Sequence, residues 1–300
     1  MKLCIIGGGS KDKSALYLYG ESKKFKEISK SLLVSLPKLY VEGYERVVYR
    51  NKDITNYDFC ILHVLNNAFP FNYIVANILK NRGVILTHKP KAYLYVNKLF
   101  LPKVFNKAKV KYPKTYLTIA PEVSKYIVDE FDKLVFKLMD VHSGKGVIVL
   151  KDKSAADAII DTLHRTSKHF CMQEVIEGEV IKLLVVGKEV IGVKETPKPD
   201  EMRSNIFQKR TFFKPSNELS KIGRRVARAL GALYCEVDVI GEGEYYAIDI
   251  SVHPNLLMYK ELSGRNIAKI LLNSLLEKKE RVERWKRILW RKIIRPFHYI

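Results

Sequence analysis

The chain has 300 residues, more than one average domain, so two or three lobes are expected. Hydrophobic residues make up 47% of it, enough for a core, which excludes wholesale disorder. Its 53 basic residues against 32 acidic ones give a formal net charge of +21. This charge favours an anionic substrate, nucleic acid or an acidic membrane face, with a solvated basic surface as the simpler alternative.

The cysteines indicate a reducing compartment. Cys4, Cys60, Cys171 and Cys235 lie far apart, without CxxC or CxH spacing, and are typical of buried thiols rather than a zinc site. The first apolar run, Lys2 to Ile6, is too short for a signal peptide, and no stretch of 18 apolar residues could span a bilayer. A soluble, cytoplasmic protein is therefore expected.

The first 88 residues have the pattern of a parallel α/β lobe. Short apolar runs predict strands at residues 2–6, 59–64 and 84–87, with a helical pattern from Ile74 to Leu79. The loop Gly7-Gly8-Gly9-Ser10 lacks the full GxGxxG spacing of a dinucleotide site and is typical of a simple turn. Nothing in this lobe indicates a reaction.

The next segment mixes helices with extended chain. Residues 92–108 are predicted to form a helix that carries Lys98. The following segment, Tyr112-Pro113-Lys114-Thr115, is predicted to be extended, because proline restricts the conformation of the residue before it. Ala120-Pro121-Glu122 begins another helix. Ser154, with Asp157 three residues later, resembles a capping pattern for a helix that runs to about His164.

Between these helices lies a candidate phosphate-binding hairpin. Two β-prone runs, Leu134 to Leu138 and Val147 to Leu150, bracket the turn His142-Ser143-Gly144-Lys145-Gly146. Glycine lets backbone N–H groups approach phosphate oxygens closely, and Lys137 on the incoming strand would be a fixed cation beneath them. By itself this pattern is more often a surface turn.

The remaining chain alternates strands and helices. Strands are predicted at residues 172–176, 180–186, 190–194, 234–240 and 245–250, with a hairpin turn at Gly187-Lys188. Residues 196–215 form a polar excursion, and Gly231 ends a helix that begins near Leu219. A regular hairpin around Gly241-Glu242-Gly243 would bring Asp238 and Asp249 together.

The end of the chain is basic. Residues 262–276 have an amphipathic helical pattern, and residues 278–295 carry nine bases against two acids. This segment is either a continuation of the helix laid on the body of the protein or a helix that binds a membrane surface or an acidic partner.

In this order the motifs resemble the ATP-grasp ligases, in particular the RimK-like group that joins glutamate or another amino acid to a carboxylate. The resemblance covers about residues 90–275 and implies an ATP-grasp fold, α/β with α+β lobes, behind an N-terminal parallel α/β pre-ATP-grasp domain. The implied domains are residues 1–88, the central subdomain 89–173, the C-terminal subdomain 174–277 and a basic helix 278–300.

The resemblance also implies the site residues. ATP would be bound by Lys98, Lys137, Ser143, Gly144, Lys145, Gly146, Gln173, Glu174, Val175, Ile176 and Glu179. Arg203 and Asn205 of the loop Met202-Arg203-Ser204-Asn205 would be catalytic, and Asp238, Asp249 and Ser251 would bind Mg²⁺, with Mn²⁺ as the alternative ion. The chemistry would be activation of a carboxylate as an acylphosphate, followed by attack of an amine.

Three departures from the family pattern stand out. Asp249 and Ser251 occupy the places of a glutamate and an asparagine, which puts the second metal position in doubt. Val180-Ile181-Lys182 replaces the acidic-isoleucine-arginine pattern, so Glu179 or Glu177 would contact the ribose. His253 is either a substrate contact or a loop histidine. Two alternatives follow: an ATP-binding homologue with weak or lost ligase activity, and a nucleic-acid or membrane-surface binder that uses the basic tail.

Overall fold

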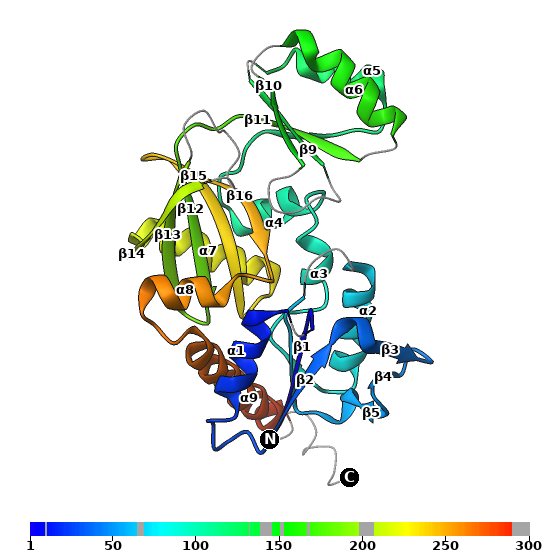
Figure 1. The fold of residues 1–300 in the computed structure, drawn as a ribbon, viewed down its shortest axis with the longest axis vertical. Helices are drawn as coiled ribbons and strands as arrows, with labels where there is room; N and C mark the ends of the chain where they lie inside the picture. The colour runs from blue at the N-terminus through cyan, green and yellow to red at the C-terminus, as the bar shows by residue number, and fades with distance from the viewer. Residues whose placement is uncertain are drawn as a thin grey trace.

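The computed structural model describes residues 1–9, 11–64, 69–131, 133–138, 146–150, 153–166, 169–197 and 207–289. Figure 1 shows three sheet-containing regions stacked along the long axis, with the N-terminal region at one end and the β8–β11 region at the other. None of the described helices has the length and apolar character needed to cross a bilayer.

The N-terminal region contains the predicted parallel sheet, with strand order β2-β1-β6-β7. Its elements are β1 Lys2–Gly7, α1 Lys13–Ser22, β2 Lys30–Ser35, β6 Phe59–Leu62, α2 Phe69–Asn81 and β7 Ile85–Leu86. A small antiparallel sheet that was not predicted comprises β3 Leu39–Glu42, β4 Arg46–Tyr49 and β5 Lys52–Asp53. Two 3₁₀ turns, Leu36–Lys38 and Ile54–Asn56, flank it.

The single helix predicted over residues 92–108 was wrong. The structure has two helices, α3 Ala92–Tyr95 and α4 Leu101–Ala108. Between them the Asn97 side chain accepts a hydrogen bond of 3.0 Å from the backbone N–H of Leu99, an alternative to continued helical bonding. Pro102 lies in the first turn of α4, where its missing N–H costs nothing.

The central region is an antiparallel sheet of order β10-β9-β11-β8, with two helices on one face (Figure 1). Its elements are β8 Thr115–Leu117, α5 Pro121–Val128, β9 Leu134–Leu138, β10 Val147–Leu150, α6 Ala156–Arg165 and β11 Phe170–Glu174. The predicted cap at Ser154 was wrong: a 3₁₀ turn, Lys153–Ala155, leads into α6, and the residue at the N-cap is Ala155, whose methyl group cannot accept a hydrogen bond.

The third region is an antiparallel sheet of order β14-β13-β12-β15-β16. Its elements are β12 Glu179–Val186, β13 Glu189–Pro197, β14 Phe207–Phe213, α7 Asn217–Leu230, β15 Tyr234–Gly241, β16 Tyr246–Ser251 and α8 Leu256–Ser263. Val186 pairs with Glu189, which confirms the turn at Gly187-Lys188, and Gly231 ends α7 as expected. The polar excursion was wrong in part, because it contains β14.

The C-terminal helix differs from its prediction. Gly264, with φ of 68°, ends α8, and α9 then runs without a break from Ile267 to Leu289. Lys278 on α9 donates a hydrogen bond of 2.6 Å to the carbonyl of Leu86, so this part of the basic helix lies against the N-terminal sheet. Residues 290–300 of the basic tail are outside the described residues.

Buried side chains form three clusters, and two of them join the N-terminal and five-stranded sheets. One contains Cys4 and Ile6 of β1 with Val237 of β15, and the other contains Leu3 of β1 with Leu184 of β12. The third cluster lies within the central region, around residues 127–172. The four cysteines are buried free thiols, as predicted.

Candidate active site

Lys137 lies in the middle of the central sheet, where β9 pairs with both neighbours. It is opposite Val147 on β10 and Cys171 on β11. Its half-buried side chain lines a small cavity together with residues of α4, β8, β11 and β16. The cavity is lined by Lys98, Leu101, Pro102, Phe105, Tyr112, Thr115, Lys137, Cys171, Gln173 and Ile248. The lining thus includes the predicted cations Lys98 and Lys137, the predicted hinge residue Gln173, and Ile248, which precedes Asp249.

The electrostatics of Lys137 connect the two halves of the site. Burial lowers the pKa of its ammonium group, and the positive charge of Lys98 lowers it further. The carboxylates of Asp249 and Asp238 act in the opposite direction and raise the pKa. Lys98 lies in the turn between α3 and α4. Its Nζ donates a hydrogen bond of 2.9 Å to the carbonyl of Leu138 on β9, which positions it. Lys137 of the central sheet is thus influenced by a cation of the α3–α4 turn and by carboxylates of the five-stranded sheet.

The predicted adenine hinge follows β11. The amide nitrogen of the buried Gln173 side chain donates to the Thr115 hydroxyl at 2.8 Å. Glu174 uses its own N–H to bond the Lys114 carbonyl, and its Oε1 accepts from the Lys114 N–H at 2.6 Å. Both polar side chains therefore fix the start of β8 against β11.

The other predicted hinge residues lie on the connection to β12. The N–H of Val175 donates to the carbonyl of Lys133 at 3.3 Å, and Ile176 is half-buried. The exposed Glu179, at the first position of β12, forms an ion pair of 2.6 Å with Lys194 on β13. The connection itself is anchored by its backbone rather than by buried side chains.

The predicted metal ligands come together as the sequence indicated. Asp238 on β15 lies directly opposite Asp249 on β16, and a bulge interrupts the ladder immediately after Asp238. Asp249 Oδ1 accepts from the N–H of Ile250 at 2.8 Å, and Ser251 Oγ accepts from the N–H of His253 at 3.1 Å. Two carboxylates and a hydroxyl on adjacent strands provide the oxygen donors that Mg²⁺ prefers.

Lys182 is the main feature of the site that sequence reasoning missed. Its ammonium group, 6% exposed, lies 2.7 Å from Asp238 Oδ2, 3.5 Å from Glu236 Oε1 and 3.9 Å from Glu195 Oε2. Tyr259 donates a further hydrogen bond of 2.7 Å to Glu236. Lys182 and Asp238 are cross-strand partners on β12 and β15. A prediction of how these two strands pair would therefore have found this contact.

This cluster shifts the titration of its members. Burial raises the pKa of Asp238 to about 7; Lys182 opposes that shift, while Glu236 and Asp249 reinforce it. Burial acts to lower the pKa of Lys182, but the attraction of Asp238, Glu236 and Glu195 outweighs it, so the net shift is upward. Lys182 therefore stays charged and holds a group of carboxylates that would otherwise repel one another.

Several predicted residues lie outside the described part of the chain. These are Ser143, Gly144 and Lys145 of the glycine loop and Arg203 and Asn205 of the predicted catalytic loop. Gly146 is described: it is buried, and its carbonyl accepts from the N–H of Leu138 at 2.7 Å, which closes the base of the hairpin.

Comparison with known proteins identifies the family. A family model for the RimK-like ATP-grasp domain matches residues 96–275. The chain belongs to the RimK-like ATP-grasp family. The expected family and fold class are therefore confirmed, and so, at the level of the family, is the expected class of enzyme, an ATP-dependent ligase.

The relatives of this RimK-like chain are ligases. A probable alpha-L-glutamate ligase of Desulfotalea psychrophila is 23% identical over 253 residues, 81% of this chain but only 54% of that protein. A probable alpha-L-glutamate ligase of Pseudomonas fluorescens strain Pf0-1 is 24% identical, over 78% of this chain and 77% of the relative.

Solved structures show the same fold. The ATP-grasp ligase PsnB in complex with a minimal precursor aligns with a TM-score of 0.71 at 15% identity, covering 93% of this chain and 99% of PsnB. D-alanine–D-alanine ligase of Bacillus anthracis in complex with ATP aligns with a TM-score of 0.68 at 16% identity, covering 95% and 99%.

Proposed function

We propose that this RimK-like chain uses ATP to activate a carboxylate as an acylphosphate and joins it to an amine or amino acid. One observation carries the proposal: Lys137 of the central sheet and Lys98 of the α3–α4 turn line one small cavity with Ile248, the neighbour of Asp249, and the carboxylates of Asp249 and Asp238 raise the pKa of Lys137. Phosphoryl transfer depends mostly on positioning and on charge stabilisation, which such an arrangement supplies.

Each group has a proposed role. Lys137 and Lys98 bind phosphate oxygens of ATP, while the segment from Gln173 to Ile176 borders the adenine. Asp238, Asp249 and Ser251 hold Mg²⁺, or Mn²⁺ as the alternative, which would neutralise phosphate charge when bound. Arg203 and Asn205, on the loop outside the described residues, keep their proposed catalytic role.

ADP release in the presence of ATP, Mg²⁺, pooled amino acids and candidate acids tests this proposal. Lys137→Met should lower turnover by about 100-fold or more, because it removes a positioned cation. Lys133→Met is the matched control: Lys133, just before β9, is exposed and paired with Glu177 at 2.6 Å. ADP release that stays at background with every acid, or equal effects of the two variants, would contradict the assignment.

The substrates are a second level of the proposal. The curated relatives are named glutamate ligases, and PsnB has been solved with a precursor peptide. Glutamate as the amine and a peptide or protein carboxylate as the acid are therefore the first pair to assay, followed by small acids. An acidic partner for the basic tail would show as salt-sensitive binding that disappears on deletion of residues 278–300.

ATP binding with weak or lost turnover is the second candidate function. The observation that favours it is Lys182 Nζ at 2.7 Å from Asp238, which competes with a metal ion for that carboxylate. Asp249 and Ser251 also replace the usual glutamate and asparagine. If the wild type binds ATP without releasing ADP, while Asp249→Glu combined with Ser251→Asn restores release, this second function is correct.

A further inference from the structure

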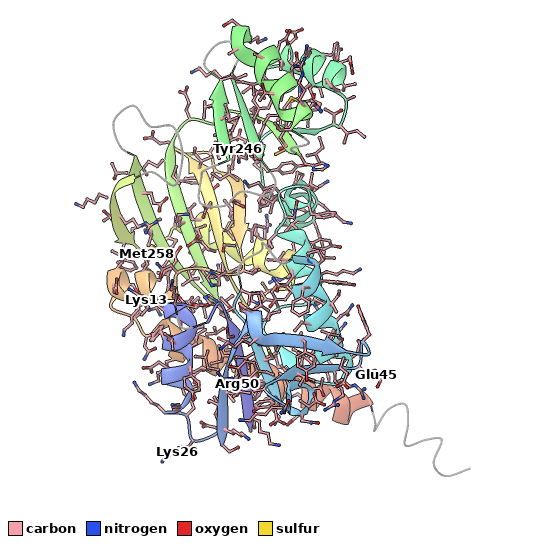
Figure 2. The ribbon with its side chains drawn as sticks, turned by 45° about the vertical axis from the view of Figure 1, so that its right-hand side comes forward. Lys13, Lys26, Glu45, Arg50, Tyr246 and Met258 are labelled. Atoms are coloured by element: carbon pink, nitrogen blue, oxygen red, sulfur yellow. The ribbon has the colours of Figure 1, made fainter. Side chains whose placement is uncertain are left out.

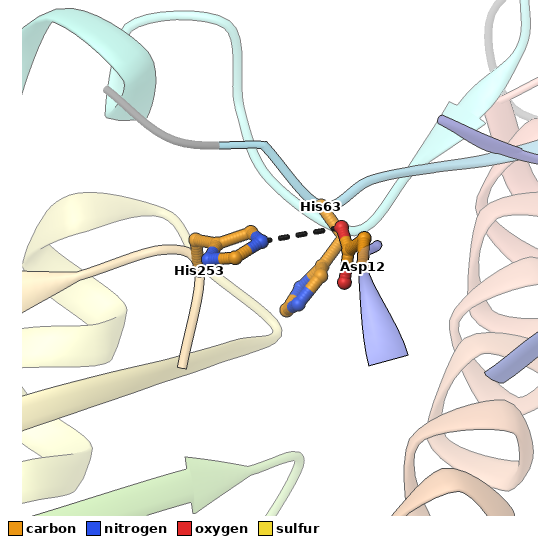
Figure 3. Close-up of side chains that lie close together, drawn as sticks. All are labelled: Asp12, His63 and His253. Atoms are coloured by element: carbon orange, nitrogen blue, oxygen red, sulfur yellow. Dashed lines mark hydrogen bonds and ion pairs between the residues drawn. The ribbon is translucent and has the colours of Figure 1, made fainter. Parts of the chain in front are cut away.

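A second group of polar side chains lies where the N-terminal region meets the five-stranded sheet. Asp12 precedes α1, His63 follows β6 and His253 follows β16 (Figure 3). Their potential ligand atoms, one carboxylate oxygen and two imidazole nitrogens, all lie within 4.8 Å of one another. The rings of His63 and His253 are 4.0 Å apart between centroids. Three separated elements thus direct metal-ligating atoms to one point.

His63 carries the strongest indication of a missing partner. Its ring is fully buried, and Nδ1 is held by the Tyr234 hydroxyl at 2.9 Å. Among the described residues Nε2, also buried, has no hydrogen-bond partner. A buried polar atom without a partner is costly. Metal-bound histidines typically have this arrangement, with one nitrogen oriented by a neighbouring group and the other free to coordinate.

Backbone donors orient Asp12 at the cluster. Its Oδ1 accepts a hydrogen bond of 2.9 Å from the N–H of Ala15, and its Oδ2 accepts one of 3.0 Å from the N–H of Gly8. Oδ2 also lies 3.3 Å from His253 Nε2. A positioned carboxylate thus lies beside an imidazole nitrogen.

We propose that Asp12, His63 and His253 form a binding site for a divalent transition-metal ion, best matched by Zn²⁺. Two imidazoles and one carboxylate are a ligand set of zinc, whereas Mg²⁺ prefers oxygen ligands alone. Zn–N bonds of about 2.1 Å place ligand atoms about 3.3 Å apart, so coordination needs a small inward rotation of side chains. The His253 side chain, 24% exposed, has room for this movement.

The site has an open side. Asp12 and His253 also line a cavity of about 540 Å³ between α1 and α8. Lys13 and Met258, both labelled in Figure 2, are among its other lining residues. Three protein ligands leave a fourth position, which water or an anionic group entering this cavity would fill. Lys11 and Lys13 line the same cavity and favour the anion. The proposal does not depend on the ligase reaction.

Equilibrium dialysis of the full chain tests the site. The chain, freed of metal with a chelator, is dialysed against Zn²⁺ in excess Mg²⁺, which saturates the oxygen-ligand site. We expect one Zn²⁺ per chain, with X-ray absorption showing two imidazoles and no sulfur, since the four buried cysteines are the competing ligands. Sulfur ligation, or no stoichiometric Zn²⁺, would overturn the proposal.

Two variants and two controls locate the ion. His253→Asn and Asp12→Asn should each weaken Zn²⁺ binding by at least about tenfold. Asn keeps an oxygen acceptor for the Ala15 N–H and is itself a favoured residue at a helix N-cap, so the start of α1 is retained. His164→Asn on α6 and Asp249→Asn at the oxygen-ligand site should leave Zn²⁺ affinity unchanged. Loss of Zn²⁺ binding in Asp249→Asn, or its retention in both cluster variants, would refute the assignment.

Discussion

Replacing Lys182 by methionine tests whether its ammonium group holds the carboxylate cluster together. Methionine fills a similar volume but removes the ammonium group that is ion-paired with both Glu236 and Asp238. Removing one partner of a buried ion pair costs about 3–5 kcal/mol, because the remaining charge is left uncompensated. We therefore expect the free energy of unfolding to fall by about 4 kcal/mol at pH 8, measured by urea denaturation.

The pH dependence distinguishes electrostatics from packing. In the wild type the pKa of Asp238 is already raised to about 7, and loss of Lys182 raises it further. A carboxyl group with a raised pKa costs stability as pH rises from its ordinary value towards its folded value. The cost of Lys182→Met should therefore be smaller at pH 5, where the carboxyl is protonated, than at pH 8. Added Mg²⁺ should stabilise the variant more than the wild type.

Lys194→Met on the adjacent strand is the matched control. Lys194 pairs with Glu179 at 2.6 Å, but its side chain is 42% exposed, so the variant should lose less than about 1 kcal/mol. Equal costs for the two variants, or a Lys182→Met cost that is the same at pH 5 and pH 8, would show that the cluster does not depend on this charge.

Three further predictions concern stability. Burial lowers the pKa of His88 to about 3, so its contribution to the free energy of unfolding is complete above pH 6.5 and is lost as pH falls. Between pH 8 and pH 5 the free energy of unfolding in urea should therefore fall less for His88→Gln than for the wild type, by up to about 1.4 kcal/mol per pH unit. Gly178, with φ of 136°, would place a Cβ 2.6 Å from the Gly241 Cα, so Gly178→Ala should lower the midpoint of thermal unfolding, and an unchanged midpoint would refute the clash. At Gly20 of α1 an added Cβ would meet nothing within 4 Å, so Gly20→Ala should stabilise the protein by about 0.5–1 kcal/mol and raise the midpoint of thermal unfolding. A lower midpoint would count against a helix at this position.

The sequence predicted best where turn chemistry and apolar pattern agree. The two-residue turn Gly187-Lys188 sets the register of β12 and β13, and the glycines at 241 and 243 allow the hairpin that places Asp238 opposite Asp249. In both cases the decisive interactions are local along the chain, so spacing determines geometry. The pairing of Asp238 with Asp249 was predictable for the same reason.

Prediction failed where the deciding interaction is tertiary or local polar bonding replaces a periodic pattern. β14 carries the polar run Gln208 to Thr211 and forms by backbone pairing with β13, which apolar periodicity does not reveal. The break after Tyr95 depends on one side-chain bond of Asn97. The cluster of Asp12, His63 and His253 has no local motif, because its members meet only when the N-terminal and five-stranded sheets pack together.

The hydrophobic core is divided between the central region and the rest of the protein, and the candidate site lies where the two meet. The buried cluster of the central region contains described residues of that region alone, whereas each of the other two clusters combines residues of the N-terminal and five-stranded sheets. Hydrophobic burial therefore resists separation within each body more than rotation between them. Lys137 belongs to one body and Asp249 to the other, and the bond from Lys98 to the Leu138 carbonyl links them. A rotation of the central sheet would therefore change the distance between Lys137 and Asp249 without opening either of these cores.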